Sequence, residues 1–118
     1  MKRRMKDLTG AAADHFSYLI VYAPEFPAED ATDVNRECQR LLGMLQEIEQ
    51  RAGDTPKKQW LKLAITETVQ ARDAFASNDA TMANDLLHAA EEHFRAYLAG
   101  KQARPSFIGG PDGTIEKV

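Results

Sequence analysis

The sequence predicts an all-α fold, an antiparallel four-helix bundle with a C-terminal tail that is irregular or forms a short β-hairpin. Two observations support this prediction. Apolar residues recur at helical spacing in four segments, and breaks rich in Pro, Gly, Asn or Asp separate these segments. No stretch shows the strand–helix–strand pattern of a parallel sheet. The length of 118 residues suits one domain with one core.

The helical domain is expected to cover residues 1–104, and the tail to cover residues 105–118. The helices are predicted at about 7–23, 29–52, 56–77 and 79–101. Pro24 and Pro27 end the first helix, because proline lacks the N–H that a helix interior requires. Apolar residues cover wide arcs of the first and third helices, so these two are expected to be the most buried.

The second helix has the clearest pattern. Its apolar residues are spaced 4-3-4-3-4 and form one seam, which consists of Val34, Cys38, Leu41, Leu45, Ile48 and Ala52. Because polar residues occupy the opposite face, this seam is predicted to lie in the core. Cys38 is therefore expected to be a buried apolar residue and not a nucleophile.

The breaks around the third helix carry signals for helix ends. Gly53 suits the left-handed residue that follows a helix, and Pro56 suits the first position of the next one. Asn78 and Asp79 form a polar turn that can cap the fourth helix. In the tail, the glycine-rich run 109–113 excludes a helix, and its flanking segments are β-prone.

Charge and cysteine content narrow the class of protein. Four of the first six residues are basic, which leaves 11 basic and 18 acidic residues from Asp7 onward. An acidic body repels the phosphates of nucleic acid, so no nucleic-acid partner is expected, and the alternative is that the basic N-terminal tip touches nucleic acid or an anionic lipid surface. The longest near-apolar run, 15–23, is too short to cross a bilayer, so no membrane partner is expected. A single cysteine, Cys38, excludes an internal disulfide framework and a cysteine-rich zinc site. A soluble cytoplasmic protein is expected.

The motifs of common enzymes are absent from the sequence. It contains no phosphate-binding glycine loop, no nucleophile elbow and no zinc-protease helix motif. Asp85, His88 and Glu92 share one helix face at i, i+3 and i+7, which is suitable spacing for metal ligands. That face lies opposite the apolar arc, so it is expected to face water. The sequence therefore predicts no enzyme, no metal and no cofactor.

Histidine and tyrosine form a stripe on the first helix. His15, Tyr18 and Tyr22 recur at i, i+3 and i+7, a composition that suits recognition surfaces and small-ligand pockets. The alternative is that the tyrosines cover the core and their hydroxyls reach water. On the fourth helix, His93 borders the apolar arc and is expected to be a hydrogen-bonded boundary residue.

The third helix carries two charged residues within its apolar arc, Glu67 and Arg72. A buried charge must be paired or must line a cavity, because an isolated one costs several kcal/mol or more by order of magnitude. One interpretation is that both residues rim the arc. The other is that Trp60, Glu67 and Arg72 mark the functional face, as a partner groove or a pocket wall.

These features favour a small non-enzymatic binding module that acts through protein–protein contact, as a regulator, an adaptor or an inhibitor of the immunity type. The expected partner is another protein, and a homo-oligomer is an open alternative. A second hypothesis is a sponge or sensor for a small ligand or nucleotide, with its pocket near Trp60, Glu67 and Arg72. A metal-dependent bundle enzyme is the least favoured hypothesis.

Overall fold

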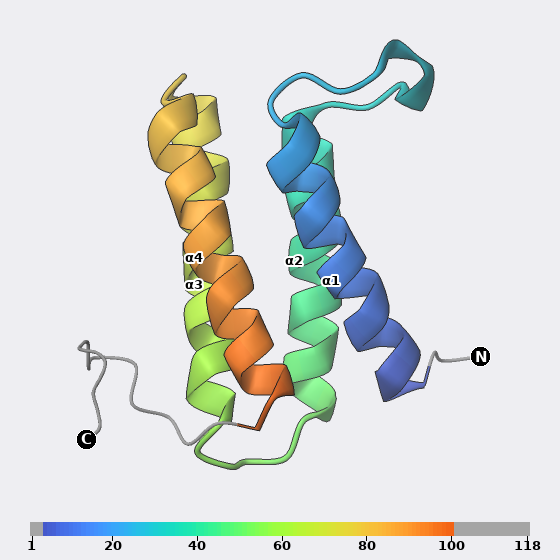
Figure 1. The fold of residues 1–118 in the computed structure, drawn as a ribbon, viewed down its shortest axis with the longest axis vertical. Coiled ribbons are helices and arrows are strands. Elements are labelled where there is room, and N and C mark those ends of the chain that lie inside the picture. Colours follow the sequence, from blue (N-terminus) through green and yellow to red (C-terminus); the bar gives the residue numbers. More distant parts are fainter. Residues whose placement is uncertain (1–3, 101–118) are drawn as a thin grey trace.

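The computed structural model describes residues 4–100, and over this range the chain is helical and has no β-strand (Figure 1). Its α-helices are α1 (Met5–Tyr22), α2 (Val34–Arg51), α3 (Lys58–Ala76) and α4 (Ala80–Leu98), and a short 3₁₀-helix, η1, spans Ala28–Asp30. The prediction of an all-α fold with four helices is confirmed. The tail at 105–118, with its possible hairpin, lies outside the described residues.

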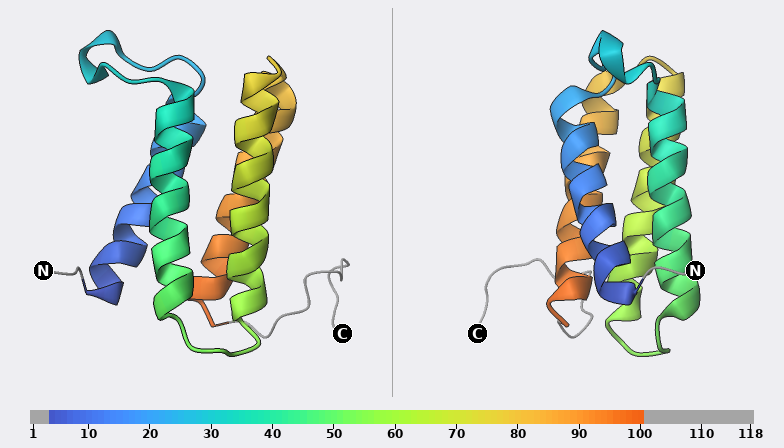
Figure 2. Two further views of the ribbon diagram at one scale, coloured as in Figure 1. Left: turned by 180° about the vertical axis from the view of Figure 1, so that it is seen from behind. Right: turned by 90° about the vertical axis from the view of Figure 1, so that its right-hand side faces the viewer.

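Successive helices run in opposite directions, so the bundle has two distinct ends (Figure 1). The α1–α2 and α3–α4 connections meet at the upper end of the view, and the α2–α3 connection lies at the lower end. Each helix packs on two others, since α1 and α3 each contact both α2 and α4. Figure 2 shows α1 and α4 on one side of the bundle and α2 and α3 on the other.

The core lies between all four helices. On α2, the seam residues Cys38, Leu41, Leu45 and Ile48 are completely buried, whereas Val34 and Ala52 at the two ends of the seam are partly buried. The 4-3 spacing argument is therefore confirmed for the middle of the seam. Phe16 of α1 and Phe94 of α4 meet at the centre with their ring centroids 5.6 Å apart. The largest fully buried apolar side chains are Phe16, Phe94, Leu19, Leu41, Leu45, Ile48, Leu61 and Leu87.

The predicted start of the second helix was wrong by one turn and more. The helix begins at Val34 and not at residue 29, and Asp33 caps it by accepting a hydrogen bond from the Arg36 N–H at 2.8 Å. Before this cap, η1 is followed by Ala31, whose φ of 50° is left-handed and incompatible with a continuing helix. The acidic composition of 29–33 is compatible with a helix, but the left-handed backbone at Ala31 and the cap at Asp33 prevent α2 from extending back over these residues.

Of the helix-end signals predicted on either side of α3, those at the α2–α3 connection were wrong and those at the α3–α4 connection are confirmed. At the α2–α3 connection, Ala52 ends the helix with extended backbone, and Gly53 does not adopt positive φ. Pro56 precedes α3, because the N–H groups of residues 58–60 bond three residues back and make a tight turn there. At the α3–α4 connection, Asn78 has a φ of 62° and Asp79 caps α4 through Met82 N at 3.1 Å, as predicted.

The expectation that the first helix is among the most buried was wrong. Only Leu8, Ala12, Phe16 and Leu19 of α1 are buried, fewer residues than on any other of the four helices. A wide apolar arc shows only that apolar residues are spread around the helix. Burial depends on how many neighbouring side chains cover that surface. Val21, in the last turn of α1, is 69% exposed.

Within residues 4–100, no helix has the length and apolar character of a membrane span.

Candidate functional site

Trp60, Glu67 and His93 form a compact cluster between α3 and α4. His93 Nδ1 donates to Glu67 Oε1 at 2.7 Å, and the His93 and Trp60 rings stack with centroids 5.5 Å apart. The Trp60 side chain is largely buried, and its Nε1 has no hydrogen-bond partner among the described residues. The prediction that His93 is a hydrogen-bonded boundary residue is confirmed. The partner of Glu67 is this histidine and not Arg72.

Arg72 lies on another side of α3. At about 100° per residue, it is displaced from Trp60 and Glu67 by roughly a third of a turn. Its guanidinium donates to Oδ1 of the neighbouring Asp73 at 3.3 Å. Burial raises the pKa of the Cys38 thiol on α2 to about 11, and the nearby positive charge of Arg72 acts in the opposite direction and lowers it. The structure therefore does not join Arg72 to Trp60 and Glu67 in one pocket.

The aromatic stripe on α1 contacts the connection that follows it. His15, Tyr18 and Tyr22 are successive neighbours, with centroid distances of 5.7 Å and 5.4 Å, and Tyr18 also stacks on Phe26. The Tyr18 hydroxyl donates to Asp30 Oδ2 at 2.5 Å, and this bond raises the pKa of Tyr18 to about 12. Tyr18 thus attaches the α1–α2 connection to the bundle, whereas His15 contacts Glu37 of α2.

Glu37 is a buried carboxylate that the sequence analysis missed. It is 1% exposed and contacts the Thr32 hydroxyl, Arg40 Nη1 at 2.8 Å and His15 Nε2 at 3.0 Å. His15 donates to the main-chain carbonyl oxygen of Glu37 at 3.2 Å, and Oε1 accepts no hydrogen bond from the described residues. One signal was present, because Glu37 follows Val34 by three residues and so falls on the seam.

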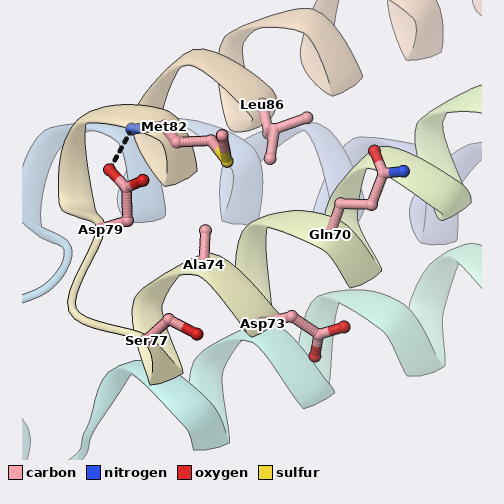
Figure 3. Close-up of a pocket in the computed structure, with 7 residues that line it drawn as sticks. All are labelled: Gln70, Asp73, Ala74, Ser77, Asp79, Met82 and Leu86. Carbon is pink, nitrogen blue, oxygen red and sulfur yellow. Dashed lines mark hydrogen bonds between the residues drawn. The ribbon is translucent and has the colours of Figure 1, made fainter.

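An open groove continues along α3 and α4 beyond the Trp60 cluster. It has a volume of about 520 Å³ and is lined by Gln70, Asp73, Ala74, Ser77, Asp79, Met82 and Leu86. Figure 3 shows Met82 and Leu86 of α4 facing Ala74 of α3, with the carboxylates of Asp73 and Asp79 at the margins. On α3, Trp60, Glu67 and Ala74 recur every seven residues, so the cluster and the groove occupy one helix face.

Exposed large apolar residues concentrate at the upper end of the bundle. Val21 and Tyr22 in the last turn of α1 are 69% and 43% exposed, and Met82 in the first turn of α4 is 54% exposed. Leu98, at 44%, lies at the opposite end. Single exposed apolar residues are common on protein surfaces. Three at one end, one of them in a groove, make that end the strongest candidate for a binding surface.

Acidic residues are also concentrated at the upper end of the bundle. We define the upper end as residues 19–37 and 70–85, and the lower end as residues 4–13, 44–62 and 91–100 (Figure 1). The upper end has eight acidic and two basic residues, a net charge of −6. The lower end has six acidic and seven basic residues, a net charge of +1. Residues 4–100 have 16 acidic and 10 basic residues, also a net charge of −6, so the groove end accounts for the net negative charge of the described residues.

The metal-ligand spacing on α4 lies on the water side of that helix. Asp85, His88 and Glu92 are all exposed, as their helical positions predicted. Within residues 4–100, no group of three or more His, Cys, Asp or Glu side chains is arranged to hold a metal ion.

Comparison of the chain with protein-family models, with curated proteins and with solved structures found no match in any of the three.

Proposed function

We propose that this chain is a small protein-binding module, which acts as a regulator, adaptor or inhibitor by contact and not by catalysis. The observation that carries the proposal is the position of Val21, Tyr22 and Met82, which leave large apolar side chains exposed at the upper end of the bundle. Exposed apolar surface with a polar margin is typical of protein interfaces. Because the single Cys38 is buried and needs no oxidising compartment, we place this activity in the cytoplasm.

The shape of the groove supports a protein partner. A small-molecule site encloses most of its ligand, whereas this groove is open and runs between two helices. The alternative of a ligand pocket at Trp60, Glu67 and Arg72 has less support. Arg72 lies on another side of α3, and the Glu67 carboxylate is already paired with His93.

Photo-crosslinking tests this function directly. A photoreactive phenylalanine analogue replaces Met82 in one variant and His88 in a control variant, and both positions are exposed on α4. We expect irradiation of cells of the source organism to give a discrete protein adduct from position 82 and none from position 88. No adduct at 82, or the same adducts from both positions, would contradict the proposal. An adduct between two copies of the chain would indicate self-association.

A further inference from the structure

The groove between α3 and α4 combines an apolar floor with acidic margins (Figure 3). We infer that it binds a cationic amphipathic helix of a partner protein, an inference that rests on the protein-binding function proposed above. The apolar face of that helix would lie over Ala74, Met82 and Leu86, and its Lys or Arg side chains would reach Asp73 and Asp79. The groove residues, the charges around them and the dimensions of the groove each support this partner chemistry.

The floor of the groove offers side chains that a partner can still cover. Met82 is 54% exposed and Leu86 is partly exposed, and the two are one helical turn apart on α4. Ala74 on the opposite wall is small and leaves room between the helices. Methionine adapts its shape to different apolar surfaces, and grooves of this kind accept apolar residues at i, i+3 or i+4 spacing from a helix.

Each carboxylate at the margin uses one oxygen within the protein. Asp73 Oδ1 accepts from Arg72, and Asp79 Oδ1 accepts from Met82 N in the helix cap. No described residue hydrogen-bonds to Oδ2 of either side chain, so each carboxylate can accept from a cation without losing its internal bond. Charge-assisted hydrogen bonds of this kind fix the orientation of a partner.

The charge of the upper end selects among classes of partner. A net charge of −6 over residues 19–37 and 70–85 attracts a cationic segment before contact is made. The same charge repels nucleic-acid phosphates and anionic lipid headgroups. A cationic protein segment is therefore the class of macromolecule that fits both the floor and the margins.

The size of the groove matches a short helix. Residues 70–77 of α3 advance by about 10 Å, which is two helical turns. A partner helix of two to three turns would therefore place two apolar residues over the floor and basic residues near both aspartates. An extended strand would need an exposed sheet edge to pair with, and residues 4–100 contain no sheet.

Synthetic peptides test the partner chemistry without knowledge of the natural partner. The probe is a helix of about 18 residues, with Leu on one face at i, i+3, i+4 and i+7 spacing and Lys elsewhere. One control peptide has the same composition with Leu distributed over all faces, and another has Glu in place of Lys. We expect only the probe to bind wild-type protein, with affinity that falls as salt screens the charges. Its NMR shift changes should concentrate at residues 70–86.

Matched protein variants locate the binding charge. Asp73→Asn with Asp79→Asn removes two charges while asparagine still caps α4. Glu49→Gln with Asp54→Asn removes two charges at the lower end, where neither side chain has a hydrogen bond or ion pair to the described residues. We expect the groove variant to weaken probe binding about fivefold or more, and the control to leave it within about twofold. Met82→Gln should weaken binding about fivefold by removing apolar contact.

The outcomes separate this inference from the proposed function. Equal weakening by the two double variants would show general charge attraction, and failure of the probe to bind would exclude the partner chemistry; either result overturns the inference. If position 82 still crosslinks to a protein in cells, the binding function stands without it. A dimer that the groove variant dissociates would make a second copy the occupant and also overturn the inference. Circular dichroism of every variant checks that the helices remain formed.

Discussion

The buried carboxylate of Glu37 provides the most discriminating test of how the upper end is built. Glu37 is 1% exposed, and Arg40 is the only arginine or lysine among the described residues that pairs with it, at 2.8 Å. Removing Arg40 leaves a negative charge in the interior, whereas removing Glu37 leaves a cation that can turn to water. Because desolvation of the carboxylate dominates the cost, the two substitutions should have unequal effects on stability.

The magnitude follows from the exposure of the two partners. Breaking a fully buried ion pair by removing one partner costs about 3–5 kcal/mol. The Arg40 side chain is 56% exposed, so water weakens this pair, and His15 and Thr32 still contact the carboxylate after its loss. We therefore expect Arg40→Gln to cost about 2 kcal/mol. Glu37→Leu replaces the carboxylate with an apolar group of similar size and should cost no more than about 1 kcal/mol.

Urea unfolding followed by circular dichroism measures both changes. With a denaturant slope of about 1–3 kcal/mol per molar, Arg40→Gln should lower the midpoint by roughly 1 M. Once Glu37 is leucine, Arg40→Gln should add little, so the double variant should resemble Glu37→Leu alone. Arg36→Gln, which removes an exposed arginine on the same helix, is the control. A larger loss for Glu37→Leu than for Arg40→Gln, or additive losses, would refute this account.

Three further predictions concern other parts of the molecule. Leu41→Ala or Leu45→Ala should each cost about 2–5 kcal/mol because both side chains are fully buried, and unchanged denaturation midpoints would remove the α2 seam from the core. His88→Ala should change stability by no more than roughly 0.5 kcal/mol, since His88 is exposed; a large loss in melting temperature on chelation of divalent ions would instead indicate a bound metal. Asp30→Asn should lower the pKa of Tyr18 from about 12 toward 10 in an ultraviolet titration of the phenol, because the substitution removes the charged acceptor; an unchanged titration would contradict the assigned bond.

The helices could be predicted from the sequence where local pattern decides them. The α2 seam needs only the spacing of Cys38, Leu41, Leu45 and Ile48, and all four are buried. The start of α2 was missed in part because its local cap, Asp33, was overlooked, and in part because contacts between distant segments hold the connection before it. Tyr18 of α1 binds Asp30 in η1, and this contact is not visible in the local pattern of residues 29–33.

In the candidate site, too, contacts between residues that are distant in the sequence could not be predicted from the local pattern. The sequence grouped Trp60, Glu67 and Arg72 as one candidate site. The structure brings only Trp60 and Glu67 together, through His93, which lies 26 residues beyond Glu67. Glu67 and Arg72 face different sides of α3 and have different partners, His93 and Asp73, so the structure does not bring both into one site. A helical arc indicates which residues share a face, but only the neighbouring helix determines which charged side chain finds a partner.

The concentration of negative charge at one end of the bundle depends on the order and direction of the helices more than on any single contact. In an up-down-up-down bundle, the first and third connections share one end, and the second connection lies at the other. The acidic residues concentrate in and around the first and third connections, although these are about 45 residues apart in the chain. The negative end therefore follows from helix order and composition together, and it persists whatever conformations the side chains adopt. The proposal of a cationic partner rests on this polarity, whereas the position proposed for that partner in the groove rests on Met82 and Leu86.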